Sequence, residues 1–258
     1  MATYSRSTHH SGNVAQYRIH RVPMTRPLVW LGRGWQDLLH QPLASLAWGA
    51  LVSGLGALIL AYGRHPYFIA AMASGFLLVG PVITAGLCEL SRRRDCGEPG
   101  GFEDSLAPLR RNRKGLTEFA QILLLVSLVW FTLSASILYF ALGEVAPAVT
   151  TTVWGDVMLR LSVPQLTAYI GSGALLALLV FTLSVVTVPM IVDRHVDAST
   201  AMHTSLQVSL RDAPAMAVWA VVVTGLVIVG FATGLIAMVL IFPVLGHATW
   251  QAYRDLVY

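Results

Sequence analysis

The stretch QLTAYIGSGALLALLVFTLSVVTVPMIV, residues 165–192, contains no Asp, Glu, Lys, Arg or His. A helix needs about 20 consecutive apolar residues to cross the hydrocarbon core of a bilayer, and this stretch exceeds that length. A helix also satisfies its own backbone hydrogen bonds, which fatty tails cannot do. The stretch therefore predicts a membrane-spanning helix.

Similar uncharged stretches occur at 43–62, 67–88 and 119–142, and a longer one covers 214–246. The last is too long for one untilted span, and residues 230–234 (GFATG) mark a place for a tight turn within it. We therefore expect an all-α, polytopic membrane bundle of six transmembrane helices arranged as three hairpins. The expected spans are 43–62, 67–90, 118–142, 165–192, 214–229 and 234–250, and five spans are the main alternative.

The composition places the whole chain in the membrane class. Only 12% of its 258 residues are charged, against about 25% in a typical soluble domain, and the mean hydropathy is +0.66. Residues 1–26 are polar and lack the apolar stretch of a secretory signal peptide. We expect a flexible N-terminal arm over 1–26, followed by one membrane domain over 27–258.

The basic residues predict the orientation. Cytoplasmic segments carry an excess of Lys and Arg. With six spans and an inside N-terminus, only Arg64 and Arg160 fall outside, and an outer loop at 143–164 lies on the membrane surface. The other fifteen basic residues fall inside: Arg6, Arg18, Arg21, Arg26, Arg33, Arg92, Arg93, Arg94, Arg110, Arg111, Arg113, Lys114, Arg194, Arg211 and Arg254. The pattern predicts that both termini face the cytoplasm of a bacterial-type inner membrane.

An internal duplication supports the sixth span. The pattern W-x4-[ST]-G-L occurs at 48–55 and again at 219–226, with Pro42 and Pro214 just upstream. Farther along, Pro81 precedes Arg92 by eleven residues, as Pro243 precedes Arg254. The simpler interpretation is a duplicated helical hairpin, and chance similarity is the alternative.

Short amphipathic stretches precede each expected hairpin. Their apolar residues recur three or four apart, which places them on one face of a helix. Such helices lie in the cytoplasmic interface, where Trp30, Trp35 and Trp48 fit the aromatic belt. Pro108 limits any helix in the second stretch. The stretches are Leu31, Trp35 and Leu38; Phe102, Leu106 and Leu109; and Met202, Leu206 and Leu210.

Four blocks resemble a known family. They are WLGRGWQDLLHQPLASLAWG, SGFLLVGPVITAGLCELSRRRDCGE, VPMIVDRHVDASTAMHTSL and GHATWQAYRDLV. Together they resemble the bacterial integral-membrane family called domain of unknown function 2189, from about Arg26 to the C-terminus. The resemblance implies a six-helix inner-membrane protein and supplies no activity. Cys88 and Gln251 depart from the family pattern, which commonly has an aromatic residue and a second histidine there.

The residues give no support for an enzyme or a cofactor. The nucleophile, phosphate-loop and zinc-protease motifs are absent. The uncharged stretches hold no ionisable group for a proton relay, and Glu89 and Glu118 fall at helix ends, where we expect water to reach them. An uncharged polar pathway remains open, although hydroxyls in membrane helices more often bond within or between helices. Its candidates are Ser53, Thr84, Thr182, Ser184, Thr187 and Thr224.

Histidines near the inner interface are weak metal candidates. His40, His195, His203 and His247 all fall there, and His203 and His247 are the two we retain. A pair spaced by four residues on one helix would be a real ligand signal. His247 has Gln251 at that position, so structural histidines are the more common interpretation.

Charged residues at the inner helix ends are the main interaction candidates. Opposite charges there are able to cross-link hairpins, and the basic cluster also suits anionic lipid. Nucleic acid is a poor partner, because acidic residues interrupt the cluster. The candidates are Arg92, Arg93, Arg94, Asp193, Arg194, His247, Trp250, Arg254 and Asp255.

These features favour a non-enzymatic accessory or scaffold subunit that packs against lipid or other subunits of a membrane complex. Small residues on the helices allow close approach of neighbours. The alternatives are a channel or carrier for a small neutral solute, and a metal- or haem-binding accessory at the inner interface. The small residues are Gly49, Gly54, Gly56, Gly171, Gly173, Gly225 and Gly230.

Overall fold

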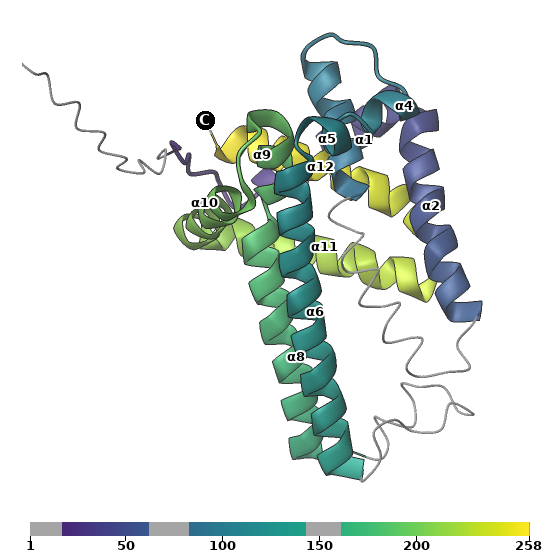
Figure 1. The fold of residues 1–258 in the computed structure, drawn as a ribbon, viewed down its shortest axis with the longest axis vertical. Coiled ribbons are helices and arrows are strands. Elements are labelled where there is room, and N and C mark those ends of the chain that lie inside the picture. Colours follow the sequence, from purple (N-terminus) through teal and green to yellow (C-terminus); the bar gives the residue numbers. More distant parts are fainter. Residues whose placement is uncertain (1–16, 62–82, 143–160, 258) are drawn as a thin grey trace, which may run out of the picture.

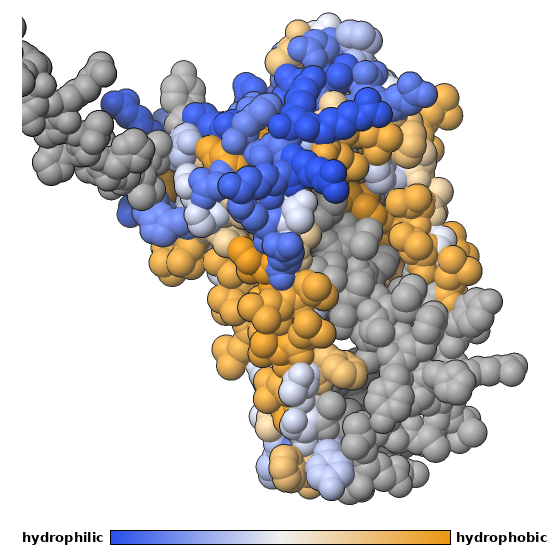
Figure 2. Space-filling model, viewed as in Figure 1, coloured by the Kyte–Doolittle hydropathy of each residue, from blue (hydrophilic) through white to orange (hydrophobic). Residues whose placement is uncertain are grey.

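The computed structural model describes residues 17–61, 83–142 and 161–257, which are mostly helical. Two long helices, α6 (Arg113–Leu142) and α8 (Val163–Ser184), run side by side (Figure 1). The short helices α4 (Phe102–Ser105), α5 (Pro108–Arg111) and α9 (Thr187–Arg194) lie at one end of this pair. Hydrophilic side chains gather at the same end, and apolar ones cover the shaft (Figure 2). This division predicts water at one end and hydrocarbon around the shaft.

Three helical segments among the described residues are long and apolar enough to cross a membrane: Arg113–Leu133, Val163–Arg194 and Ala213–Ala232. A fourth is obtained if α1 (Arg26–His40) and α2 (Pro42–Ala61), which are bent by 108°, count as one span. For the described residues, the expectation of an all-helical fold with several candidate membrane spans is therefore confirmed. The count of six stays a prediction.

Two of the six expected spans account for the difference between six and the four obtained when the bent α1–α2 pair is counted. Residues 67–82 of the second span lie outside the described residues, as does most of the loop expected at 143–164, and only the helix over 83–95 is described. The last span falls on α12 (Met238–Leu256), which does not pass the same test of length and composition. The second half of this helix carries His247, Gln251, Arg254 and Asp255, which dilute its apolar character.

The turn expected at 230–234 is present. Helix α11 (Ala213–Ala232) ends there, and Gly234 and Leu235 take φ values of +62° and +71°. The left-handed conformation is favourable for glycine, and Leu235 is held in it by contacts with α2. Ser53 donates a hydrogen bond to the Leu235 carbonyl at 3.0 Å. Residues 214–250 therefore form two helices rather than one.

Helices α2 and α11 begin alike. Pro42 and Pro214 stand at the first and second positions of their helices, where a missing N–H costs nothing. Trp48 and Trp219 follow as the seventh residue of each helix, and both are buried. The described parts of the two repeats thus share a start and a buried tryptophan.

The helix expected over 165–192 is broken. Residues Val185 and Val186 separate α8 from α9, and Pro189 provides no N–H for the Val185 carbonyl. A serine from α10 (Ala198–Arg211) occupies the break. Ser205 Oγ donates to the Thr182 carbonyl at 2.7 Å and accepts from the Val186 N–H at 3.4 Å. The break is a tertiary feature that hydropathy does not reveal.

Two of the three expected amphipathic stretches form helices, α1 and α10, and the third is divided into α4 and α5 at Pro108. The expected aromatic belt is wrong at Trp30 and Trp48, which are buried and donate to Asp255 and Ser105. Trp35 alone of the three is exposed.

Residues 17–22, which fall within the arm expected over 1–26, contact the rest of the chain. Residues 1–16 lie outside the described residues, but Ile19 forms an antiparallel bridge with Val257. The His20 N–H donates to the Leu256 carbonyl at 3.0 Å, and Tyr17, Ile19 and Val22 pack against the main core. The C-terminus therefore fixes residues 17–22.

Helix α2 offers a matched pair of glycines that tests this packing. A Cβ at Gly49 would lie 2.0 Å from the Val239 carbonyl oxygen of α12, whereas a Cβ at Gly54 meets nothing within 4 Å among the described residues. Gly49→Ala is expected to destabilise the protein by about 1–3 kcal/mol through overpacking. Gly54→Ala is expected to cause no loss, because alanine favours a helix. Thermal unfolding in detergent measures both, and equal effects would contradict the α2–α12 packing.

Candidate functional site

The second half of α12 organises the polar end of the molecule. His247, Trp250, Gln251 and Tyr253 are all buried, although each carries a polar group. Helix α12 packs against α1 and α2, and its side chains also bond residues 91–95. A buried polar group is costly without a hydrogen bond, so the partners of this half-helix define the site.

Asp37 lies at the centre of these contacts. It is 3% exposed and accepts hydrogen bonds from Ser91 Oγ at 2.7 Å and Gln251 Nε2 at 2.9 Å. Arg94 forms an ion pair with its other oxygen. Three segments, α1, 83–95 and α12, therefore meet on one carboxylate. We call Asp37, Ser45, Ser91, Arg94, His247 and Gln251 the polar core.

The polar core has a defined direction of proton donation. Ser91 gives its only hydroxyl proton to Asp37, so the His247 Nδ1, 2.7 Å away, must donate to Ser91 Oγ. In the neutral ring Nε2 is then an acceptor, and Ser45 Oγ donates to it at 2.8 Å. The resulting chain runs from Ser45 through His247 and Ser91 to Asp37.

This series of hydrogen bonds resembles the serine–histidine–acid order of a hydrolase, but its geometry does not suit nucleophilic attack. Ser45 is 0% exposed and lies in the first turn of α2. A nucleophile must reach its substrate, and a fully enclosed hydroxyl does not. The arrangement instead holds α2, 83–95, α1 and α12 in register.

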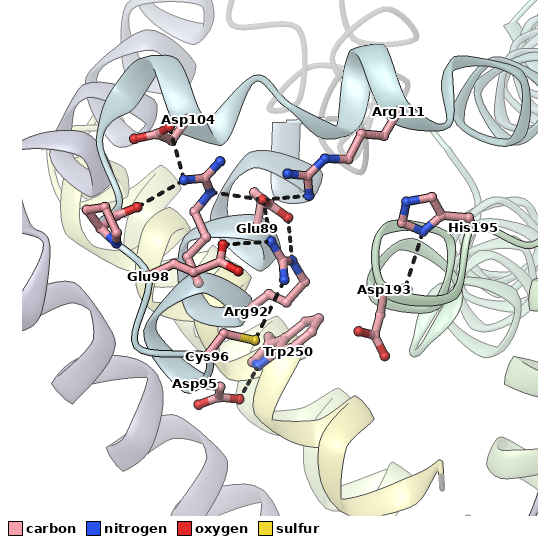
Figure 3. Close-up of polar contacts among 12 residues, drawn as sticks. Glu89, Arg92, Asp95, Cys96, Glu98, Asp104, Arg111, Asp193, His195 and Trp250 are labelled. Carbon is pink, nitrogen blue, oxygen red and sulfur yellow. Dashed lines mark hydrogen bonds and ion pairs between the residues drawn. The ribbon is translucent and has the colours of Figure 1, made fainter.

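A second cluster surrounds Glu89 (Figure 3). Glu89 is 0% exposed and is bonded by Arg92 at 2.8 Å, Arg93 at 3.0 Å and Arg111 at 3.1 Å. The expectation that water reaches Glu89 is wrong, because its carboxylate is enclosed by arginines, and one of them, Arg111, comes from α5. Glu118 is partly exposed and lies 3.8 Å from Lys114.

The outer arginine groups reach further partners. Arg92 also contacts Glu98 at 3.3 Å, and Arg93 contacts Asp104 at 3.0 Å. Cys96 Sγ lies 3.7 Å from Arg92. The basic run 92–94 is thus largely occupied by acidic neighbours, which leaves little of its charge for lipid.

The structure brings the other predicted interaction residues together around α12. Trp250 donates to Asp95 at 2.9 Å, and Arg254 lies 3.5 Å from the same carboxylate. The Tyr253 hydroxyl donates to Asp193 at 2.6 Å and accepts from Arg194 at 3.0 Å. Each contact joins α12 to another helix.

Asp255 ties α12 to α1. Arg26 approaches it at 2.6 Å, Trp30 donates to it at 2.7 Å, and Arg33 lies at 3.4 Å. Burial alone would raise the pKa of Asp255. The hydrogen bonds from Arg26 and Trp30 and the charges of Arg26 and Arg33 outweigh burial, so the pKa lies below its ordinary value.

The weak metal candidates are not equivalent. His203 is exposed on α10, whereas both ring nitrogens of buried His247 are already hydrogen-bonded. Within residues 17–61, 83–142 and 161–257, no three His, Cys, Asp or Glu side chains are grouped to hold a metal ion.

Several hydroxyls considered for a polar pathway bond to backbone instead. Ser53 donates to Leu235, Thr182 to Leu179 and Thr187 to Leu183. Ser184 Oγ is buried and has no hydrogen-bond partner among the described residues. These bonds stabilise helix ends and contacts rather than lining a path.

Sequence reasoning missed Asp37, Ser45 and Ser91. A signal was present for Asp37, since it lies seven residues after Trp30 and three after Gly34 on the buried face of α1. For the two serines no local signal exists, because their partners lie 202 and 156 residues away.

The comparison with known families decides the identification. Residues 68–193 match the model described as "Predicted integral membrane protein (DUF2189)". Over this segment, which is just under half of the chain, the sequence is similar to the DUF2189 family. The resemblance is thus confirmed over a shorter range than expected, since the match excludes 246–257. No curated protein and no solved structure matches the chain.

Within the polar core, the DUF2189 segment supplies Ser91 and Arg94, while Asp37 and His247 come from outside it.

Arg94→Met leaves Asp37 buried without its counter-charge, and we expect a loss of about 3 kcal/mol in unfolding free energy. Lys114→Met, at an 88% exposed side chain, is the control and should change little. Thermal unfolding in detergent measures both, and adding Asp37→Asn should restore part of the loss. Equal stability of Arg94→Met and the control would contradict the arrangement.

The link between Asp255 and α1 predicts a pH dependence. A lowered folded pKa stabilises the protein above the ordinary aspartate pKa of about 3.9, and the contribution is lost as the pH falls through the folded value. The stability deficit of Asp255→Asn should therefore be largest near about pH 6 and shrink toward about pH 3. Unfolding of both proteins across this range measures it, and a deficit independent of pH would exclude the ionic link.

Proposed function

We propose that this integral membrane protein is a non-enzymatic accessory or scaffold subunit of a membrane complex in a bacterial inner membrane. The α6–α8 pair carries the proposal. Large apolar side chains along it are exposed among the described residues, including Leu125, Phe140 and Leu175, and Figure 2 shows the apolar shaft. Contiguous apolar surface of this kind is suited to lipid or to another membrane helix.

A contrast between two glycines of α8 favours a partner helix on one face. A Cβ at Gly173 would lie 3.0 Å from Trp130 of α6, so this glycine serves packing within the chain. A Cβ at Gly171 meets nothing within 4 Å among the described residues. Small residues let membrane helices approach closely, and Gly171 leaves such a place open.

The polar end supports a structural role. Asp37 is satisfied by a basic, a hydroxyl and an amide partner, Glu89 is satisfied by arginines, and Ser45 is enclosed. Catalysis needs a reactive group that reaches a substrate. The buried ionisable groups described here instead connect helices to one another.

We further propose six spans with both termini inside. The positive-inside distribution and the paired starts of α2 and α11 support this topology. The apolar first half of α12 then returns toward the side on which α11 begins, and its polar second half ends among the cytoplasmic contacts.

The two alternative functions have weaker support. A path for a neutral solute needs free hydroxyls, and those of Ser53, Thr182 and Thr187 are used in backbone contacts. A metal at the inner interface needs free ring nitrogens, and those of His247 are bonded to Ser45 and Ser91. Metal analysis of purified protein tests the second alternative directly.

Affinity purification from native membranes in mild detergent, followed by mass spectrometry, tests the accessory role. The wild type should retain a membrane-protein partner, and Gly171→Leu should lose it because the larger side chain blocks close approach. Ala177→Leu introduces the same leucine side chain at an exposed position of α8 and should retain the partner. Thermal unfolding of the three proteins checks that folding is unchanged. A lone monomer in every preparation would overturn the proposal.

A further inference from the structure

The arginines of the polar end fall into two groups. The first group consists of Arg254 of α12 and of the arginines that contact α12, Asp37 or Glu89. Each of them has an acidic partner within 4 Å. The second group has no ion pair among the described residues, and two of its members, Arg18 and Arg211, line one cavity. The members of this group are Arg18, Arg21, Arg110, Arg113 and Arg211. An anion at the polar end is therefore drawn to the second group.

The cavity that Arg18 and Arg211 line is open and has a volume of about 880 Å³. One wall is the segment 17–20, and the other is the end of α10, with Gln207, Leu210 and Arg211. Two arginines from segments far apart in the sequence thus face one space. Guanidinium groups bind phosphate through several donors at once.

The wall formed by 17–20 is fixed in place. Ile19 bridges Val257, and the His20 N–H bonds the Leu256 carbonyl at 3.0 Å. The Val22 N–H donates to Asp212 Oδ2 at 2.9 Å, and Arg194 lies 5.1 Å from the centre of the Tyr17 ring. Asp212, the acidic residue next to Arg211, is buried and engaged by this backbone N–H. The backbone that carries Arg18 is therefore held beside the end of α10.

Apolar groups accompany the two charges. Leu210 is 71% exposed, and Ile19 lies on the opposite wall. Helix α10 lies where hydrophilic and apolar surface meet (Figures 1 and 2). A free phosphate would use only the arginines, whereas a phospholipid also places a chain along Leu210.

We propose that the cavity between the segment 17–20 and the end of α10 binds the headgroup of an anionic phospholipid. Arg18 and Arg211 hold the phosphate, and Leu210 and Ile19 contact the upper part of an acyl chain. This site is separate from the α8 face proposed for a partner subunit. Its test needs only the purified full-length chain.

Native mass spectrometry of the full-length protein in mild detergent, titrated with phosphatidylglycerol, measures the binding. Each basic residue near an anionic surface contributes about fivefold in affinity, so Arg18→Gln with Arg211→Gln should weaken binding by roughly 25-fold. Arg110→Gln with Arg113→Gln removes the same charge outside the cavity and should leave the affinity almost unchanged. Equal weakening in the two double variants would overturn the site.

Two further arms separate a lipid from a simple anion. Phosphatidylcholine, which has no net charge, should bind more weakly than phosphatidylglycerol. Inorganic phosphate should not displace bound phosphatidylglycerol. The Leu210→Ser variant should bind phosphatidylglycerol more weakly than the wild type does. Displacement by inorganic phosphate, with no effect of Leu210→Ser, would show an anion site without lipid recognition and contradict the proposal.

Discussion

Asp37 carries a charge in a place where only 3% of its surface is exposed, and an isolated buried carboxylate is strongly unfavourable. Arg94, Ser91 and Gln251 compensate it from two other segments of the chain. Because these partners are required, α1, 83–95 and α12 must meet at one point. His247 and Ser45 extend the contact to α2, so four segments depend on this one charge.

The rest of the architecture follows from keeping charge at one end. Glu89, Asp95, Asp193 and Asp255 each join helices through basic or aromatic partners. Because these charged groups are gathered at one end, α6 and α8 extend away from it with mainly apolar side chains. The molecule thus combines a closely bonded polar end with an open hydrocarbon-facing shaft.

Hydropathy was sufficient for the class, for the helices α2, α6 and α11, and for the turn at Gly234. It could not predict the break at Val185 and Val186, because Ser205 of another helix completes it. Nor could it predict the burial of Glu89, which depends on Arg111 closing over a helix end. Of the six residues of the polar core, only Arg94 and His247 were among the candidates predicted from the sequence. Ser45 and Ser91 are bonded to a histidine far away in the sequence, so no local pattern marks them.

Cys88 provides a direct test of the polar core. Its thiol is buried and lies 3.9 Å from the Gly246 carbonyl of α12. In Cys96→Ser protein, this is the only thiol of the chain. The rate of maleimide labelling in detergent should be low with Asp37 present and should rise when Asp37→Ala releases α12 from α1 and 83–95. Slow labelling in both proteins, with α12 still in place, would contradict the central role of Asp37.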